Sequence, residues 1–322
     1  AQAGDAIDVI ARRTGGTLTP VVLVLDSNDT PLITGYNQNA FADTGRVTLP
    51  SAGTYTIVVS RDSDQTGDTL GTYELTVRLI GAGEGSPLLA GTVGTIVYDE
   101  PLSGSIDGGR WYEDWQFTTD AGDTITLDVK RADGDLKPEV ILLGGSGQEL
   151  YHGYGDRTDA AAQIDRYQLD GAGSYVVRVS RESGQTGETS GAYLLTVTLN
   201  GAGADSPALA EPVGEVTLGE PVEGEITAAN WHNVWTFDSA QGGRIDVQVE
   251  RTSGTLSPML YILDANGQQL YSAYPPGTRD SAEITSYSLP GSGTYQIVVS
   301  RESDQGGYTV GGYQLTVSAS AQ

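Results

Sequence analysis

Apolar and polar residues alternate along many short stretches of the chain, as they do in β-strands with one buried face. In residues 173–181, Tyr175, Val177 and Val179 share one face and the intervening, more polar positions share the other. Residues 193–199 alternate in the same way. Turn signals such as Asp-Gly, Asn-Gly and Gly-Ser-Gly separate these stretches. The pattern predicts short antiparallel strands that pack as two sheets around an apolar interior.

The same pattern returns at a fixed spacing, which is typical of tandem repeats. A Gly-x-Tyr strand recurs every 120 residues, at 53–61, 173–181 and 293–301. A Tyr-x-Leu-x-Val strand recurs at 73–77, 193–197 and 313–317. We therefore predict an all-β chain of tandem, jelly-roll-like antiparallel β-sandwich domains. The predicted domains are residues 1–80, 81–200 with a linker at 81–90, and 201–322 with a linker at 201–210.

The first repeat lacks the opening strands of the other two. Ala3–Asp5 corresponds to Ala121–Asp123, yet the second repeat precedes this point with Trp111, Trp115 and Phe117. Two interpretations stay open: the sequence is a piece of a longer protein, or another polypeptide adds the missing strands. The first is favoured, because bare sheet edges are normally covered in proteins. The linkers are short and contain proline, which predicts limited bending between repeats.

Composition narrows the classes of function. The chain has no cysteine, and its 42 acidic and 17 basic residues give a net charge of −25. Such a charge repels nucleic acid and anionic membranes. No stretch reaches the roughly 18 apolar residues of a membrane span, so membrane insertion is not expected. These features are compatible with an extracellular location at a bacterial cell surface.

The order of motifs resembles the bacterial pre-peptidase C-terminal (PPC) domain. It runs from Trp115-x-Phe117 through Ala121–Ile125 and Leu136–Gly147 to Gly173–Val179 and Tyr193–Val197. The third repeat matches from Trp235 to Val317, and the first only from Ala3 to Val77. The resemblance implies a secreted β-sandwich found with proteases and other exported proteins. It implies no catalytic residues, and the family's relatives include calcium-dependent collagen-binding modules.

The residues themselves also argue against an enzyme. A nucleophilic triad needs a histidine, and the two histidines, His152 and His232, lie at different places in their repeats. A lone surface histidine beside Tyr151 is the simpler interpretation of His152. No glycine-rich loop opens a helix to hold a phosphate. We expect no catalytic residues and no required cofactor.

Calcium is the metal that the sequence favours. Asp62, Asp64, Thr66 and Asp68 place oxygen ligands at alternate positions around a glycine. The later repeats keep fewer of these oxygens, and a polar hairpin tip explains the same residues without a metal. The carboxylates near the second repeat's opening strands are a further candidate set: Asp99, Glu100, Asp107, Glu113 and Asp114.

Two repeated residue types are candidates for contacts. Loop tyrosines can stack on sugars or anchor a protein partner, or they can cover the end of the core. These tyrosines are Tyr36, Tyr151, Tyr154, Tyr271 and Tyr274. Repeated arginines are expected to tie loops by hydrogen bonds to carbonyl groups or a carboxylate, in preference to a repeated contact with a ligand or partner. They are Arg13, Arg131 and Arg251 in one position, and Arg61, Arg181 and Arg301 in another.

Two hypotheses for function follow. The first is an extracellular, non-catalytic structural or adhesive array, such as a stalk, sheath or filament subunit, that associates head-to-tail or by strand addition. Its partners are other protein chains, either further copies or a cell-surface protein. The alternative is a binding appendage that holds collagen, peptide or polysaccharide for a secreted protease or other exported enzyme.

Overall fold

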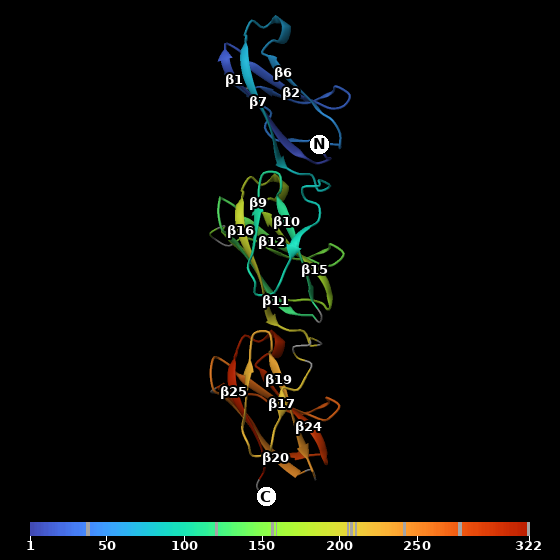
Figure 1. Cartoon of the computed structure of the whole chain (residues 1–322), viewed down its shortest axis with the longest axis vertical. Helices are drawn as coiled ribbons and strands as arrows, with labels where there is room; N and C mark the ends of the chain where they lie inside the picture. The colour runs from blue at the N-terminus through green and yellow to red at the C-terminus, as the bar shows by residue number, and fades with distance from the viewer. Residues whose placement is uncertain are drawn as a thin grey trace.

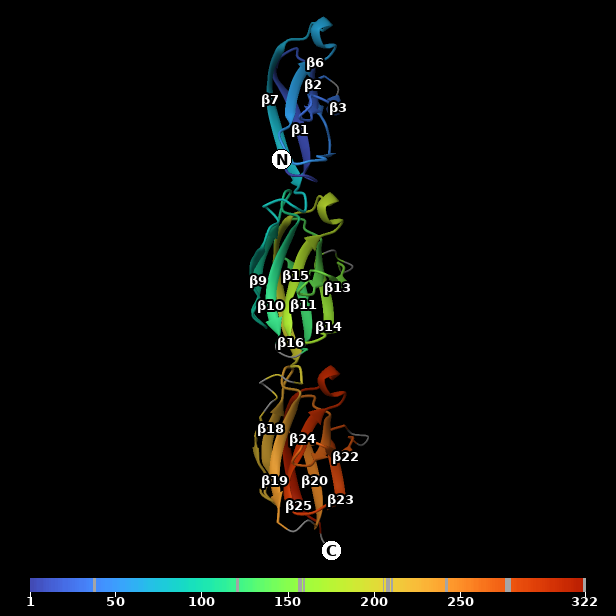
Figure 2. The ribbon, with the colours of Figure 1, turned by 90° about the vertical axis from the view of Figure 1, so that its right-hand side faces the viewer.

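The chain forms a row of β-sandwiches placed end to end (Figure 1). The computed structural model describes residues 1–36, 39–119, 122–155, 158, 160–204, 206, 209, 211–240, 243–275 and 279–320. We call residues 1–80 unit 1, 81–200 unit 2 and 201–322 unit 3, and we call the contacts between successive units joint 1 and joint 2. Figure 2 shows the units in the same orientation, with corresponding strands on the same side of the row.

Unit 2 is a complete two-sheet sandwich. One sheet has the order β13-β12-β15-β10-β8, and the other β14-β11-β16-β9. Its strands are β8 (Thr92–Thr95), β9 (Leu102–Ile106), β10 (Tyr112–Thr119), β11 (Thr124–Arg131), β12 (Pro138–Leu143), β13 (Glu149–Gly153), β14 (Ala161–Gln168), β15 (Gly173–Arg181) and β16 (Gly191–Gly201). All pairs are antiparallel except the edge pair β8 and β10, which is parallel.

Unit 3 repeats this arrangement, with sheets β17-β19-β24-β21-β22 and β18-β25-β20-β23. Its strands are β17 (Gly214–Glu215), β18 (Val222–Ile226), β19 (His232–Ser239), β20 (Gly243–Arg251), β21 (Pro258–Leu263), β22 (Gln269–Ala273), β23 (Ser281–Leu289), β24 (Gly293–Arg301) and β25 (Gly311–Ala319). Among the described residues the helical segments are three short 3-10 turns, η1 (Asp64–Thr66), η2 (Gly184–Thr186) and η3 (Asp304–Gly306). The prediction of an all-β sandwich fold is confirmed.

The inward faces of both sheets meet in a private core. In unit 2, the alternate residues Tyr175, Val177 and Val179 of β15 are buried, as predicted, against the inward residues of β11 and β16. Gly104 on β9 makes this packing possible, because a Cβ there would come within 2.3 Å of the Tyr193 ring. Each complete side chain buried this way contributes about 1.5–3 kcal/mol to stability.

Each unit has its own hydrophobic cluster. The three large clusters draw on residues 7–59, 96–199 and 216–317, and each stays within one unit. A fourth, small cluster lies at joint 1, where Leu79 of unit 1 packs against Ala82, Leu89 and Tyr112 of unit 2. The hypothesis of a separate interior for each repeat is therefore confirmed. The limits at residues 80 and 200 themselves stay a prediction.

Unit 1 keeps its sandwich but lacks one side of it. Its strands are β1 (Ala6–Gly16), β2 (Pro20–Leu25), β3 (Pro31–Tyr36), β4 (Phe41–Asp43), β5 (Val47–Thr48), β6 (Thr56–Arg61) and β7 (Gly71–Gly81). Among the described strands, none pairs with β6 and β7 as β10 and β9 pair with their equivalents in unit 2. Consequently Tyr73, Leu75 and Val77 on β7 are 46%, 40% and 50% exposed, whereas their equivalents on β16 are fully buried.

Candidate functional site

The repeated loop that follows β6, β15 and β24 forms the most elaborate polar site in the described chain. Each copy enters its 3-10 turn through a serine in the left-handed region, with φ of 63° at Ser63, 65° at Ser183 and 67° at Ser303. The loop lies at the upstream end of its unit (Figure 2). In units 2 and 3 it therefore meets the downstream end of the preceding unit.

A buried arginine anchors this loop in both complete units. Arg181 donates to Gly184 O in its own loop at 2.9 Å and to Ile80 O of unit 1 at 3.2 Å. Arg301 repeats both contacts, to Asp304 O at 2.8 Å and to Asn200 O of unit 2 at 2.9 Å. The side chains thus bridge two units, in addition to tying a loop as the sequence predicted.

A glutamine in the turn reaches across each joint. Gln185 Nε2 donates to Gly4 O at 2.7 Å and to Ala82 O at 2.9 Å. Gln305 Nε2 donates to Gly122 O at 3.1 Å and Gly201 O at 3.3 Å. These contacts were missed in the sequence, although Gln65, Gln185 and Gln305 recur in one position of the repeat.

An arginine of the preceding unit also donates hydrogen bonds to this loop. Arg46 Nη2 donates to Gln185 O at 2.7 Å. Arg166 Nη2 donates to Gly307 O at 2.7 Å and to Gln305 O at 3.2 Å, and its guanidinium lies 4.1 Å above the Tyr308 ring. Such charge-assisted bonds are stronger than neutral ones, so the joints are locked from both sides.

The linkers are also held. Trp111 Nε1 donates to Ala82 O at 2.9 Å, and Trp231 Nε1 donates to Ala202 O at 2.8 Å. A carboxylate at the start of the unit accepts the next linker N–H, from Gly83 to Asp5 and from Gly203 to Asp123, each at 2.9 Å. Apolar contacts among Ala82, Leu89 and Tyr112 cover joint 1.

Burial changes the ionisation of the anchoring arginines. The pKa of Arg301 is lowered to about 10, first by burial and then by the nearby Arg166 guanidinium. Burial also lowers the pKa of Arg181. Both side chains remain charged at neutral pH, and carbonyl oxygens provide their partners.

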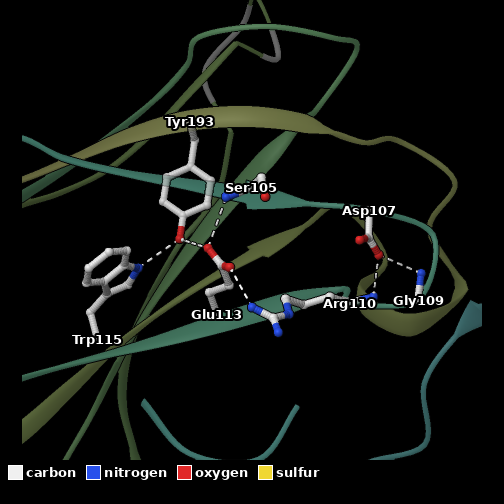
Figure 3. A network of polar contacts seen from close by, with 7 residues as sticks. All are labelled: Ser105, Asp107, Gly109, Arg110, Glu113, Trp115 and Tyr193. Atoms are coloured by element: carbon white, nitrogen blue, oxygen red, sulfur yellow. Dashed lines mark hydrogen bonds and ion pairs between the residues drawn. The ribbon is translucent and has the colours of Figure 1, made fainter. Parts of the chain in front are cut away.

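A second polar network lies inside unit 2, between β9, β10 and β16 (Figure 3). Trp115 Nε1 donates to Tyr193 Oη at 2.8 Å, and Tyr193 donates to Glu113 Oε2 at 2.7 Å. Arg110 Nη1 and Ser105 N also donate to the Glu113 carboxylate, at 3.1 Å and 3.0 Å. Burial is the main cause of the raised pKa of the Tyr193 hydroxyl.

In unit 3 an amide replaces the carboxylate, since Tyr313 donates to Asn233 Oδ1 at 2.8 Å. The site serves packing in both forms.

The predicted calcium loop is a 3-10 turn in the structure. The Asp64 carboxylate accepts a hydrogen bond from Ser60 Oγ, and Thr66 Oγ1 donates to Ser63 O at 2.8 Å. Asp62 and Asp68 are exposed. Within the described residues no group of three or more His, Cys, Asp or Glu side chains is placed to hold a metal ion. Calcium binding here stays a prediction without support from the geometry.

The carboxylates near the opening strands of unit 2 also have protein partners. Asp114 accepts both Arg178 donors, at 2.8 Å and 2.9 Å, and Asp107 accepts the N–H groups of Gly109 and Arg110 at 2.8 Å and 2.6 Å. Together with Glu113, they serve the sandwich itself. Sequence proximity alone had grouped these side chains with Asp99 and Glu100.

The histidines differ from the expectation of a lone surface side chain. His152 is partly buried, lies 3.3 Å from Glu139 Oε2 and stacks on Tyr154 with ring centroids 4.2 Å apart. Burial lowers the pKa of His232. Neither histidine is hydrogen-bonded to a serine or threonine hydroxyl in the described contacts.

The predicted loop-tying role of the repeated arginines is confirmed. Arg13, Arg131 and Arg251 donate to Leu18 O, Leu136 O and Leu256 O, respectively.

The predicted contact tyrosines lie on the surface. Tyr36, Tyr154 and Tyr274 are 71%, 68% and 69% exposed, and Tyr151 and Tyr271 are about half exposed. They belong to β3, β13 and β22 or directly follow them. These strands lie on one side of the row in all three units (Figure 2). Exposed tyrosines thus lie on or directly after the corresponding strand of each unit, one in unit 1 and two in each of units 2 and 3. Their binding role stays a prediction.

Comparison with known proteins agrees with this architecture. The model of the bacterial pre-peptidase C-terminal domain matches residues 232–301, from the first residue of β19 to the anchoring arginine of β24. This part of unit 3 is therefore similar to pre-peptidase C-terminal domains. Domains of this family are non-catalytic and are usually found in secreted proteases. Units 1 and 2 share the strand order of the PPC unit where their strands are present.

The chain also has matches among solved structures. The PPC domain of collagenase from Bacillus anthracis is 19% identical, with 33% of this chain and 96% of that chain covered and a TM-score of 0.28. The secreted serine protease VesC from Vibrio cholerae is 10% identical, with 94% and 74% covered and a TM-score of 0.22. Tripeptidyl peptidase 2 is 9% identical, with 99% and 32% covered and a TM-score of 0.23. A search of curated proteins found no sequence match.

In the part of the chain that the structure describes, no helix is long and apolar enough to cross a bilayer.

Proposed function

We propose that the chain is a stiff, non-catalytic extracellular stalk built from PPC-type units. The observation that supports it best is that the same polar joint is built twice. In each case the anchoring arginine and the turn glutamine donate to the preceding unit, and an arginine of that unit donates back. Interfaces between domains normally permit relative motion unless they are extensive. Repeated charge-assisted bonds at two successive joints restrain that motion.

A stalk needs only its ends and its outer surface for contacts. The private cores leave the surface of each unit free, and the net charge of −25 keeps the row soluble and extended. Its partners in this proposal are other protein chains at a bacterial cell surface. The match of residues 232–301 to a domain family that occurs in secreted proteins supports the extracellular location.

Paired spin labels test the stiffness. The chain has no cysteine, so Asn28→Cys, Ser146→Cys and Asn266→Cys at equivalent exposed turns can be labelled in pairs without background. We expect narrow distance distributions across joint 1 and joint 2, measured by pulsed electron resonance. Broad distributions across both joints would contradict the stalk. A single label at each site is the control for folding and for intermolecular contacts.

A second function is supported by the repeated tyrosines. Their exposure on one side of the row suits a long, periodic ligand, and the alternative proposal is an appendage that holds collagen, peptide or polysaccharide for a secreted enzyme. We expect wild-type chain to be retained on insoluble collagen or insoluble polysaccharide. The variant with Tyr36→Ser, Tyr154→Ser and Tyr274→Ser should lose at least about tenfold in affinity.

The retention assay separates the binding proposal from the stalk. Measured with and without calcium, it also tests the metal prediction at Asp62, Asp64, Thr66 and Asp68. Failure of the wild-type chain to bind either material would remove the tyrosines as a reason for a binding appendage. The matched control is Tyr308→Ser, because Tyr308 is equally exposed but lies beside joint 2.

A further inference from the structure

The downstream end of unit 3 differs from the downstream ends of units 1 and 2 at the residues that form the joints. We propose that Arg46 and Arg166 decide whether a unit can hold a successor, and that Ser286 makes unit 3 the last unit of the stiff series. The proposal rests on the stalk proposed above, because it concerns how stiffness passes from one unit to the next. It follows from side chains in the described part of unit 3.

The role of the arginine is visible at both joints. The next unit presents backbone carbonyl oxygens from its 3-10 turn, and these oxygens can only accept hydrogen bonds. Arg46 supplies the donor at joint 1, and Arg166 supplies it twice at joint 2. A guanidinium suits this task, because it is always charged and offers several donors in a fixed fork.

Unit 3 has a serine at this position. Ser286 follows Arg166 by the 120-residue repeat, and the next residues, Tyr167 and Tyr287, pair with Ile125 and Ile245 in the same register. The backbone is also conserved, with φ of 47° at Arg166 and 51° at Ser286. The change therefore leaves the backbone position as it is but replaces a long side chain with a short one. A hydroxyl on Cβ ends well short of where the arginine Nη2 lies.

The linker-holding carboxylate changes as well. Asp5 and Asp123 each accept the N–H of the following linker, but the corresponding residue of unit 3 is Gly243. A neighbouring carboxylate is engaged within the unit: Asp246 accepts from Ser286 N at 2.6 Å and Ser320 Oγ at 2.7 Å. The downstream end of unit 3 thus lacks two of the side chains that form the joints, the arginine and the aspartate.

The upstream side of the joint, by contrast, is intact in unit 3. Arg301 and Gln305 make the same contacts as Arg181 and Gln185. Unit 3 can follow another unit, but its own downstream end lacks the arginine that donates hydrogen bonds to the 3-10 turn of the next unit. Head-to-tail stacking of a second copy on unit 3 would therefore lack the lock that joins units 1, 2 and 3. This inference limits the head-to-tail assembly considered from the sequence.

A four-unit fusion tests the proposal. Appending a second copy of residues 201–320 directly after Ser320 places the new linker where Gly201 follows Asn200 in joint 2. The added unit then carries its own anchoring arginine and glutamine, and only the preceding unit differs. Spin labels at Asn266→Cys and at the equivalent asparagine of the added copy report on the new joint. Labels at Ser146→Cys and Asn266→Cys report on joint 2.

We expect the distance distribution across the new joint to be at least about twofold broader than across joint 2. Ser286→Arg should narrow it, and since Arg166 already adopts the same left-handed conformation, the substitution adds no further backbone strain. The reverse change, Arg166→Ser, should broaden joint 2. Circular dichroism and thermal unfolding of each variant establish that the units remain folded.

The outcomes separate this inference from the stalk. A broad distribution at the wild-type joint 2 would contradict the stalk itself. A narrow joint 2 together with an equally narrow new joint in the unmodified fusion would overturn the role of Ser286 alone. The role of Ser286 would also be overturned if the distance distribution across the new joint stays broad in Ser286→Arg and the distribution across joint 2 stays narrow in Arg166→Ser.

Discussion

Replacing Arg301 by methionine is expected to destabilise unit 3 by about 3–5 kcal/mol, because it leaves several buried carbonyl groups without a donor. Arg301 is 1% exposed and makes five hydrogen bonds, to Asp304 O, Thr227 O, Ala228 O, Asn200 O and Gln305 O. Methionine fills much of the same volume but donates nothing. Hydrogen exchange of peptides from β19 and β24, followed by mass spectrometry in urea, measures the loss within unit 3.

Unit 1 provides the matched control. Arg61 occupies the same place in its repeat, and its hydrogen bonds to described residues stay within its loop, to Asp64 O at 2.7 Å and Gln65 O at 3.4 Å. Since Arg61 is partly exposed, we expect Arg61→Met to cost less than about 1 kcal/mol. Equal losses for the two variants would show that the contacts that Arg301 makes beyond its loop, to Thr227 O, Ala228 O and Asn200 O, contribute nothing to stability.

Leu195→Ala is the second large effect that we expect, at about 3–4 kcal/mol for unit 2. Leu195 is fully buried in the unit 2 core, where β16 is covered on one edge by β9 and faces Trp115 and Phe117 across the sandwich. Truncation to alanine removes buried methyl groups and leaves a cavity that the surrounding strands cannot fill. Denaturation in urea, monitored by exchange of unit 2 peptides, gives the change in free energy.

The equivalent residue of unit 1 is the control, because the strands that cover Leu195 in unit 2 have no counterpart in the described part of unit 1. Leu75 lies on β7 and is 40% exposed, because none of the strands that the structure describes covers it. Leu75→Ala should therefore cost less than about 1 kcal/mol. A loss at Leu75 as large as that at Leu195 would show that the open face of unit 1 is covered in solution.

Much of the fold could be predicted because it rests on local pattern. Period-two alternation at Tyr175, Val177 and Val179 fixed which residues face the core, and recurrence every 120 residues placed the same strands in unit 3. The parallel edge strands β8 and β17 escaped prediction. They are short, and the chain reaches them through a linker without alternation.

The joints could be predicted only in part. The repeated arginine was assigned to loop-tying, which it does, but its second partner lies in another unit, more than 100 residues away along the chain. A partner that is a backbone carbonyl leaves no signature in residue identity. The recurrence of Gln65, Gln185 and Gln305 was the available signal. The substitution at Ser286 acquires meaning only once Arg166 is seen in contact with the turn at Gly307.

The path of the chain determines how the molecule would respond to mechanical tension. Units 2 and 3 are entered near their upstream ends and left at their downstream ends, so tension on the chain shears their strands along their length. In unit 1 the first strand begins beside the point where the last strand leaves, since Ala6 pairs with Gly81. Pulling these two points apart opens the β1–β7 ladder one hydrogen bond at a time. A pull between Ala6 and Gly81 would thus unzip unit 1 at a lower force than the tension that shears the strands of units 2 and 3.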